Sequence, residues 1–455
     1  LLALASGALS QNVVHFNVTK GLPGVHFGSA PSLARRGTYA EQLINDIAGG
    51  GYYVEVKVGT PGQTLTMLLD TGSSDAWVLG YNADLCTQEQ LQQHYGMTCT
   101  DTYDPTQSSS ERLIKKDGFK ITYLDGAVAA GDYILDDFSI GGATVKSLQM
   151  AYVTKTVRGT GILGLGFSIS ERAATKYPNI MDEMANQGLI GSKAYSLYLN
   201  DRRTDSGSIL FGGIDTDKFI GPLEILPLHK PPGGEYSSFE VNFTSVAISY
   251  TNGTRLSIPT AILDYPAPAV LDSGTTLSYL PDEMAQSIYS ALGSATVYEP
   301  DLSMTLIDCA YQAAEPNLHL TITFTPTLTI TIPIWELILD ILDPAYPQSD
   351  PPPAAQTWTK TCVFGLQSTA LFTQTGTIQT APGGDGPQYV NFTLLGDTFL
   401  RSAYVVYDLS HYQIGLAQAN LNSTASTVVP LSSEAAGLPT LTGVSAQQTT
   451  YTPTP

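Results

Sequence analysis

The sequence contains an internal repeat centred on an aspartate, and this repeat limits the possible folds more than any other feature. Residues 68–74 read Leu-Leu-Asp-Thr-Gly-Ser-Ser, and residues 270–276 read Val-Leu-Asp-Ser-Gly-Thr-Thr. Each copy is followed much later by two apolar residues and a glycine, at 162–164 and at 394–396. A single Asp-[Thr/Ser]-Gly is usually a turn at the end of a buried strand. Two copies with matching distant partners predict two related lobes.

The repeated aspartates, Asp70 and Asp272, each follow two apolar residues. We therefore expect each carboxylate at the end of a buried strand, where it must accept hydrogen bonds to offset its loss of water. Glycines bring backbone amides close, one pair of hydroxyl residues donates to the outer oxygens, and another pair bonds across the lobe boundary. The supporting residues predicted in this way are Thr71, Gly72, Ser73, Ser273, Gly274, Thr275 and Thr276. Twofold symmetry between the lobes would make the two aspartates face one another.

Two facing carboxylates have a definite chemical use. They cannot both ionise at low cost, so over an acidic pH range the pair would hold one proton. The ionised member then removes a proton from a shared water, which attacks a carbonyl carbon, while the protonated member donates to the carbonyl oxygen. This chemistry requires neither a serine nucleophile nor a metal, and we expect no cofactor.

Short runs of alternating β-branched and aromatic residues cover the chain from Gly51 to about Gln418. Clear examples lie at residues 53–58, 119–123, 320–324 and 403–407. Because Gly, Asn, Asp and Pro separate these runs, the pattern predicts an all-β protein. Helices are predicted at residues 180–187 and 282–292.

The composition excludes several other classes of protein. With 455 residues, 43% of them apolar, the chain can bury the core of two or three domains or of one large bilobal unit. It carries 21 Lys and Arg against 41 Asp and Glu, a net charge of −20, and so lacks the basic face that nucleic acid requires. No run of about 18 apolar residues predicts a membrane helix. Nothing indicates an oligomer, and we expect a monomer.

The cysteines and sequons favour the secretory route. Four cysteines allow three pairings, and their order favours Cys86 with Cys99 and Cys309 with Cys362. Their spacing is not that of a zinc site, so no metal is predicted. Five N-x-[ST] sequons are candidate glycosylation sites, at Asn17, Asn242, Asn252, Asn391 and Asn422.

Residues 1–36 differ in charge from the rest of the chain. They contain Lys20, Arg35 and Arg36 but no acidic residue. Residues 1–9 resemble the end of a signal-peptide apolar region, and the arginine pair before Gly37 is typical of a dibasic processing site. We therefore predict a signal remnant and propeptide that is cleaved after Arg36. Opposite charge would hold this arm over an acidic cleft as an intramolecular inhibitor. The alternative is an exposed arginine pair in a loop.

The last segment, residues 421–455, contains 13 Ser or Thr, four Pro and a single charged residue, Glu434. Such a composition predicts a flexible stalk rather than a packed element. A stalk of this kind often precedes a lipid-anchor signal, and membrane attachment, if any, would be through such an anchor.

Together with the repeat, one further motif makes the chain resemble the pepsin-like aspartic endopeptidases, from about Gly51 to Gln418. Residues 119–126, Phe-Lys-Ile-Thr-Tyr-Leu-Asp-Gly, are similar to the flap hairpin that closes over substrate in that family. The resemblance implies that Tyr123 is the flap tyrosine and hydrogen-bonds Trp77. It also implies that Asp125, beside Gly126, meets either substrate backbone or a cationic side chain. Substrates would be extended polypeptides.

Within that family, the chain is most similar to fungal yapsin-like, surface-associated members. The resemblance rests on the form of residues 272–281, the dibasic site and the Ser/Thr-rich tail. It implies a secreted, extracellular or cell-wall enzyme, with cleavage beside Lys or Arg. A broader hydrophobic preference is the alternative.

The resemblance also implies a bilobal organisation. We expect a propeptide region over residues 1–36, an N-terminal lobe over 37–222, a C-terminal lobe over 223–420 and the tail over 421–455. Two competing functions are an inactive pepsin-fold binding protein and a glycoside hydrolase with two carboxylates. The first is disfavoured by the intact aspartates, and the second does not explain the paired loops.

Overall fold

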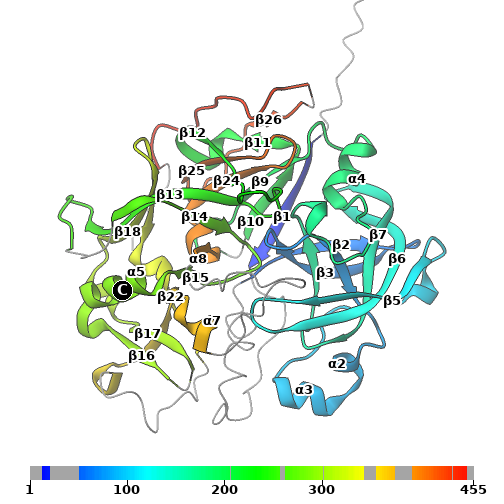
Figure 1. Ribbon diagram of the computed structural model, residues 1–455, viewed down its shortest axis with the longest axis horizontal. Coiled ribbons are helices and arrows are strands. Elements are labelled where there is room, and N and C mark those ends of the chain that lie inside the picture. The colour runs from blue at the N-terminus through cyan, green and yellow to red at the C-terminus, as the bar shows by residue number, and fades with distance from the viewer. Residues whose placement is uncertain are drawn as a thin grey trace, which may run out of the picture.

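The structure is a computed structural model that describes residues 13–20, 51–204, 206–256, 262–300, 302–342, 355–374, 392–432 and 434–447. Two lobes rich in β-strands lie side by side, the first half of the chain on the right of Figure 1 and the second half on the left. The prediction of an all-β, bilobal protein is confirmed. The strands of the first lobe are β2 (Tyr52–Val58), β3 (Gln63–Asp70), β4 (Ala76–Leu79), β5 (Arg112–Thr122), β6 (Val128–Ile140), β7 (Ala143–Thr156) and β8 (Gly161–Gly164).

The second lobe is built on a sheet of seven strands with a sheet of four beside it. The larger sheet contains β13 (Glu240–Tyr250), β14 (Ile262–Leu271), β15 (Ser278–Leu280), β18 (Leu318–Thr325), β19 (Leu328–Pro333), β22 (Leu366–Ser368) and β23 (Leu394–Leu395). The smaller contains β16 (Thr296–Glu299), β17 (Met304–Asp308), β20 (Ile338–Leu339) and β21 (Thr361–Phe364).

The two copies of the internal repeat lie in the same arrangement of paired strands, one in each lobe. In the first lobe β3 pairs in parallel with β8, so that Asp70 lies opposite Gly164. In the second lobe β14 pairs in parallel with β23. A Cβ atom on Gly164 would lie 2.6 Å from the carbonyl oxygen of Asp75, and one on Gly396 would lie 2.3 Å from that of Thr275. The glycine of each distant partner segment is thus required by the close approach of the backbone that follows the aspartate loop.

Strands from both halves join the lobes. The first lobe belongs to a sheet of thirteen strands, which continues through β1 (Val14–Lys20), β10 (Ser206–Phe211), β9 (Ala194–Tyr198), β24 (Ala403–Asp408), β25 (Gln413–Ala419) and β12 (Phe219–Pro227). One contact between the halves is the antiparallel pair of β9 with β24, in register at Leu197 and Val405. The predicted lobe boundary between residues 222 and 223 falls inside β12. Hydrophobic periodicity does not reveal a strand that is shared by two lobes.

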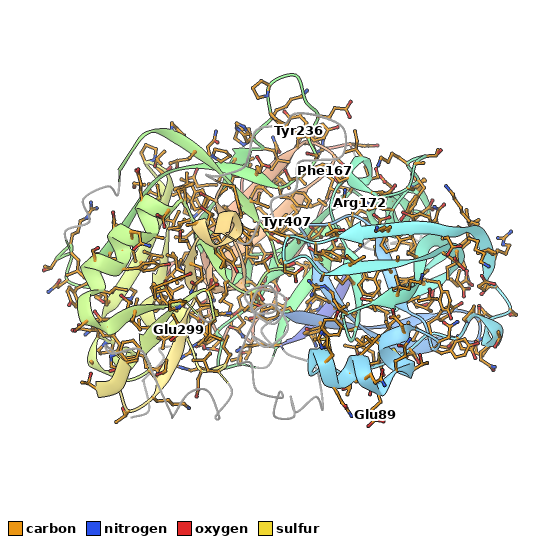
Figure 2. The ribbon with its side chains drawn as sticks, turned by 60° about the horizontal axis from the view of Figure 1, so that its bottom comes forward. Glu89, Phe167, Arg172, Tyr236, Glu299 and Tyr407 are labelled. Carbon is orange, nitrogen blue, oxygen red and sulfur yellow. A yellow bond between two sulfur atoms is a disulfide. The ribbon has the colours of Figure 1, made fainter. Side chains whose placement is uncertain are left out.

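Aromatic side chains pack along this junction. The ring of Phe167 lies 5.0 Å from that of Phe239 and is stacked on that of Tyr412 at 5.9 Å. The ring of Tyr407 lies 4.7 Å from that of Phe239 and stacks on that of Tyr195 at 4.9 Å. Figure 2 shows Phe167 and Tyr407 in the middle of the molecule, between the two lobes. Tyr412 is exposed, but the other four rings are buried and hold the two halves together through their apolar area.

Helices are short and few among the described residues. They are α2 (Asp84–Thr87), α3 (Glu89–Tyr95), α4 (Ile180–Asn186), α5 (Asp282–Leu292), α6 (Tyr311–Ala314), α7 (Ala370–Gln374) and α8 (Asp397–Leu400). The predicted helices are confirmed as α4 and α5, and α4 ends one residue earlier than expected. The side chain of Asn179 caps α4 by accepting from the backbone of Met181 and Asp182. Within the described part of the chain, no helix has the length and apolar character to cross a membrane.

The described part of the basic N-terminal arm is a strand inside the large sheet. Strand β1 pairs with β10 from Val14 to Thr19 and with β2 at its end. Val14 and Val18 are buried and Phe16 between them is half-buried, so that one face of the strand is apolar, which explains why this segment enters the sheet. The expectation from charge, that the whole arm lies over a cleft, is wrong for residues 13–20. The processing site at Arg35 and Arg36 lies outside the described residues.

The predicted flexible tail is also wrong for the part of residues 421–447 that the structure describes. Strand β26 (Val428–Pro430) pairs with β11 (Gly213–Asp215). Leu431 and Leu438 are buried, and Val444 forms a bridge to Ile220 in β12. A Ser/Thr-rich composition predicts flexibility because such residues form no core of their own. Here a few apolar residues of this segment pack into the core of the lobes instead.

Both predicted disulfides are confirmed. Cys86 is bonded to Cys99, and Cys309 is bonded to Cys362. The first bridge closes the loop that carries α2 and α3, and the second joins the end of β17 to β21. Asp340 lies beside the second bridge, but both sulfurs there are bonded to one another and are not available as thiolate ligands.

The sequons differ in accessibility. Asn17, Asn242 and Asn252 are exposed, whereas Asn422 is half-buried and its side-chain nitrogen donates to Asp201 at 3.4 Å. Asn391 lies outside the described residues. Glycosylation at these positions stays a prediction.

Candidate active site

The two repeated aspartates lie at the ends of matching strands and have matching hydrogen bonds. Asp70 ends β3, where its Oδ1 accepts from the Gly72 amide at 2.8 Å and its Oδ2 accepts from the Ser73 hydroxyl. Asp272 follows β14. Its Oδ1 accepts from the Gly274 amide at 2.8 Å, and its Oδ2 accepts from the Thr275 hydroxyl at 2.7 Å.

The loops bring the two carboxyl groups to one point. A Cβ atom on Gly72 would lie 2.6 Å from Oδ1 of Asp272. A Cβ atom on Gly274 would lie 2.3 Å from Oδ1 of Asp70 and 3.2 Å from Oδ1 of Asp272. Any side chain at these glycines would therefore fill the space where the carboxylates meet. The close approach of each loop to the opposite aspartate explains why both copies of the repeat need glycine.

Hydrogen bonds of Thr71 and Ser273 join the two aspartate loops to one another. The hydroxyl of Thr71 donates to the carbonyl oxygen of Leu271 at 2.9 Å and accepts from the Ser273 amide at 3.0 Å. The hydroxyl of Ser273 donates to the carbonyl oxygen of Leu69 at 3.0 Å and accepts from the Thr71 amide at 3.3 Å. The predicted bonds across the lobe boundary are present in both directions. Thr276 is also buried, and its carbonyl oxygen accepts from the Thr398 amide at 3.1 Å.

Replacing Thr71 by alanine is expected to lower the free energy of unfolding by about 1–3 kcal/mol, because the buried Ser273 amide and the Leu271 carbonyl both lose their partner. Urea unfolding followed by fluorescence measures this loss. Thr329, on the exposed face of β19, is a matched position where alanine should have little effect. Equal stability losses at the two positions would contradict a specific role for the Thr71 hydroxyl.

Burial raises the pKa of Asp70, and the negative charge of Asp272 raises it further. Burial likewise raises the pKa of Asp272, while hydrogen bonds from Thr275 and Gly274 act in the opposite direction. The two groups lie within electrostatic and hydrogen-bonding reach of each other. A pair of this kind retains one proton to a higher pH than an isolated aspartate would. The arrangement therefore provides one acid and one base at a single site.

The hairpin of β5 and β6 carries the residues expected to cover the site. At its tip the amide of Tyr123 donates to the carbonyl oxygen of Ala127 at 2.9 Å, and Gly126 has a φ of 81°, which favours glycine. The indole nitrogen of Trp77 donates to the Tyr123 hydroxyl at 2.7 Å, as predicted. Asp125 is buried and forms an ion pair with Arg158 of the same chain. The cationic partner considered for Asp125 is thus present within the protein.

Two buried acidic groups near the site were not identified from the sequence. Asp75 accepts from the hydroxyls of Tyr133 at 2.9 Å and Tyr177 at 2.8 Å, and burial raises its pKa. Asp397 follows the glycine of the second partner segment and is fully buried. Its carboxyl oxygens have no hydrogen-bond partner among the described residues, and burial raises its pKa well above the ordinary value. The asymmetry between Gly164-Leu165 and Gly396-Asp397 is a signal that could have indicated Asp397.

Two β lobes that bring one Asp-[Thr/Ser]-Gly loop each to a common point define the pepsin-like class of aspartic protease. The family described as Eukaryotic aspartyl protease matches residues 51–419, close to the range inferred from the sequence. The chain belongs to this family and is an aspartic-type endopeptidase.

Three relatives illustrate the similarity. The chain is 36% identical over 399 residues to "Probable aspartic-type endopeptidase opsB" of Aspergillus fumigatus, covering 87% of this chain and 74% of the relative. It is 34% identical over 376 residues to "Acid protease" of Saccharomycopsis fibuligera, with 81% and 80% covered. It is 31% identical over 399 residues to "Secreted aspartic protease 4" of Candida albicans, with 87% and 82% covered.

Proposed function

We propose that the chain hydrolyses peptide bonds at acidic pH by means of a water activated between Asp70 and Asp272. The observation that supports this proposal most directly is the convergence of both carboxyl groups at Gly72 and Gly274. The ionised aspartate takes a proton from the water, whose oxygen bonds to the peptide carbonyl carbon. The protonated aspartate donates its proton to the carbonyl oxygen, and the resulting tetrahedral species collapses with protonation and release of the amine.

The supporting groups have distinct roles in this proposal. Ser73 and Thr275 stabilise the outer carboxyl oxygens, so that the inner oxygens face the water. Thr71 and Ser273 keep the two loops in register across the lobes. Tyr123 and Trp77 position the hairpin next to the site, and an extended substrate would pair with the hairpin through its backbone.

The proposal is tested by incubating purified protein with a denatured protein and a peptide library between about pH 3 and 7. We expect cleavage that is strongest at acidic pH and is blocked by a statine-type inhibitor. If correctly folded and processed protein cleaves nothing, the alternative of a catalytically inactive pepsin-fold binding protein is favoured instead. The library also reports whether a basic or a hydrophobic residue is preferred beside the scissile bond.

We further propose that the enzyme is secreted as a zymogen and acts outside the cell or at its surface. Two disulfides, three exposed sequons and the similarity to a secreted aspartic protease of Candida albicans support secretion. The segment that ends at Arg35 and Arg36 would be the propeptide, acting as inhibitor of its own enzyme until cleavage.

Changing Arg35 and Arg36 together to alanine is expected to leave a longer and less active secreted form, because the processing protease would lose its basic recognition residues. Mass spectrometry of the N-terminus and activity on a peptide substrate measure the two effects. Changing Lys115 and Lys116 to alanine, an exposed basic pair on β5, is the matched control. A normal N-terminus and normal activity in the arginine variant would contradict dibasic activation.

A further inference from the structure

The tip of the β5–β6 hairpin is joined to the body of the first lobe by a buried ion pair. Nη2 of Arg158 donates to Oδ2 of Asp125, and the two side chains are only 9% and 5% exposed. The second oxygen of this carboxylate, Oδ1, accepts from the Ala127 amide at 2.9 Å. The carboxylate at the hairpin tip is therefore already neutralised by a cation from its own chain.

The Arg158 guanidinium also lies against the tyrosine of the hairpin. Its central carbon is 4.9 Å from the ring centroid of Tyr123, a distance typical of a cation–π contact. The charges of Asp70 and Arg158 both act on the Tyr123 hydroxyl, whose pKa is raised chiefly by burial. Arg158 thus lies in the same neighbourhood as the aspartate pair, against the tyrosine of the hairpin that is expected to cover a bound polypeptide.

The backbone around Arg158 is held in place by the loop that the Cys86–Cys99 bridge closes. The Gly159 amide donates to Sδ of Met97 at 3.0 Å, and its carbonyl oxygen accepts from the Thr100 amide at 2.8 Å. A Cβ atom on Gly159 would lie only 2.3 Å from the carbonyl oxygen of Thr98.

The residues before Arg158 are fixed by the first residue of α2, just before that loop. The Thr156 amide donates to Oδ1 of Asp84 at 3.0 Å, and the Arg158 amide donates to the Thr156 hydroxyl at 3.0 Å. Arg158 is therefore a pre-organised group rather than a mobile surface arginine, and little conformational entropy is lost when it pairs with Asp125.

We propose that Arg158 is a specificity-determining residue that excludes lysine and arginine from the substrate position next to the hairpin tip. This inference rests on the proposed function. A cationic substrate side chain would have to displace Arg158 from Asp125, leaving a buried guanidinium without its anion, which is costly. An apolar side chain leaves the pair intact and gains from burial beside the Tyr123 ring. The enzyme is thus adapted to hydrophobic rather than basic residues at this position, in contrast to the yapsin-like preference that the sequence suggested.

The test uses two peptides that differ only in the residue before the scissile bond, Leu or Lys, with the processed full-length enzyme at a single acidic pH. We expect wild type to cleave the Leu peptide with at least about tenfold higher kcat/KM. Arg158→Gln should raise the Lys-to-Leu ratio by about tenfold or more, because Asp125 becomes available to the substrate cation. Adding Asp125→Asn to that variant should cancel the gain, and Arg158→Lys should retain the wild-type preference.

Arg172→Gln is the matched control, because the Arg172 side chain is exposed and its loss should leave the ratio unchanged (labelled in Figure 2). A wild-type preference for Lys, or an unchanged ratio in a folded Arg158→Gln variant, would overturn the inference. If that variant fails to fold, the wild-type ratio decides the question by itself. Cleavage of the Leu peptide that is blocked by a statine-type inhibitor shows separately that the proposed function holds, so that a failure of specificity is distinguishable from a failure of catalysis.

Discussion

Replacing either Asp70 or Asp272 by asparagine is expected to reduce kcat/KM for peptide hydrolysis by about 10²–10⁴, the range associated with loss of a general acid or base. Asparagine keeps the size of the side chain and can still accept from Gly72 or Gly274. It cannot give up or take the proton that the pair must exchange with water and substrate. The fold should persist, so the loss should appear mainly in kcat rather than in KM.

A fluorogenic peptide assay at acidic pH measures this loss, and circular dichroism verifies the fold of each variant. The matched control is Asp340→Asn, because Asp340 is exposed and forms an ion pair with the exposed Lys360, in the second lobe. That variant should retain wild-type activity. Equal digestion by Asp70→Asn and wild type would show that the dyad assignment is wrong.

The free energy of unfolding is expected to fall as the pH rises from about 4 to 7. Burial raises the pKa values of Asp70, Asp272 and Asp397 above their ordinary value of 3.8, so the native state holds protons that the unfolded chain has released. Stability from these groups is fully present below pH 3.8 and is lost as the pH rises through the native pKa values. Each unit of pKa shift in one carboxyl corresponds to about 1.4 kcal/mol.

Asp397→Asn isolates one of these contributions. Asparagine is close in shape to the protonated carboxyl, so the variant should match its parent near pH 4 and be more stable near pH 7, where the buried carboxyl would otherwise ionise. Urea unfolding at both pH values measures the difference, in an Asp70→Asn background that prevents self-digestion. Asp340→Asn should give no such gain at pH 7. A stability difference between Asp397→Asn and its parent that is the same at both pH values would contradict the assignment.

The aspartate loops and the strands that pair next to them were predictable because the corresponding sequence motif occurs twice. A repeated Asp-[Thr/Ser]-Gly with a repeated distant glycine indicates symmetry, and symmetry brings Asp70 and Asp272 together without any knowledge of the intervening chain. The disulfide pairs follow from short sequence separation. Helix α5 follows from its apolar periodicity and the proline before it.

Contacts between distant and unrelated segments were not predictable in the same way. Arg158 and Asp125 are 33 residues apart, and no local pattern links them. The pairing of β26 with β11 joins residues more than 200 positions apart, and β26 is too short to have a recognisable period. The burial of Asp397 depends on how the second lobe packs around α8. Such features arise from tertiary packing, which overrides the tendencies of local composition.

The position of β1 determines whether cleavage at Arg36 would release the N-terminal segment from the protein. This strand has β10 on one side and β2 on the other, and six of its residues are in register with β10. A nick at Arg36 would sever the peptide bond without breaking either ladder of hydrogen bonds. The processed enzyme would then be a noncovalent complex in which the cleaved N-terminal segment stays bound to the rest of the chain through β1. Departure of that peptide would open a gap in the middle of the sheet, so its exchange would be slow and would require partial unfolding.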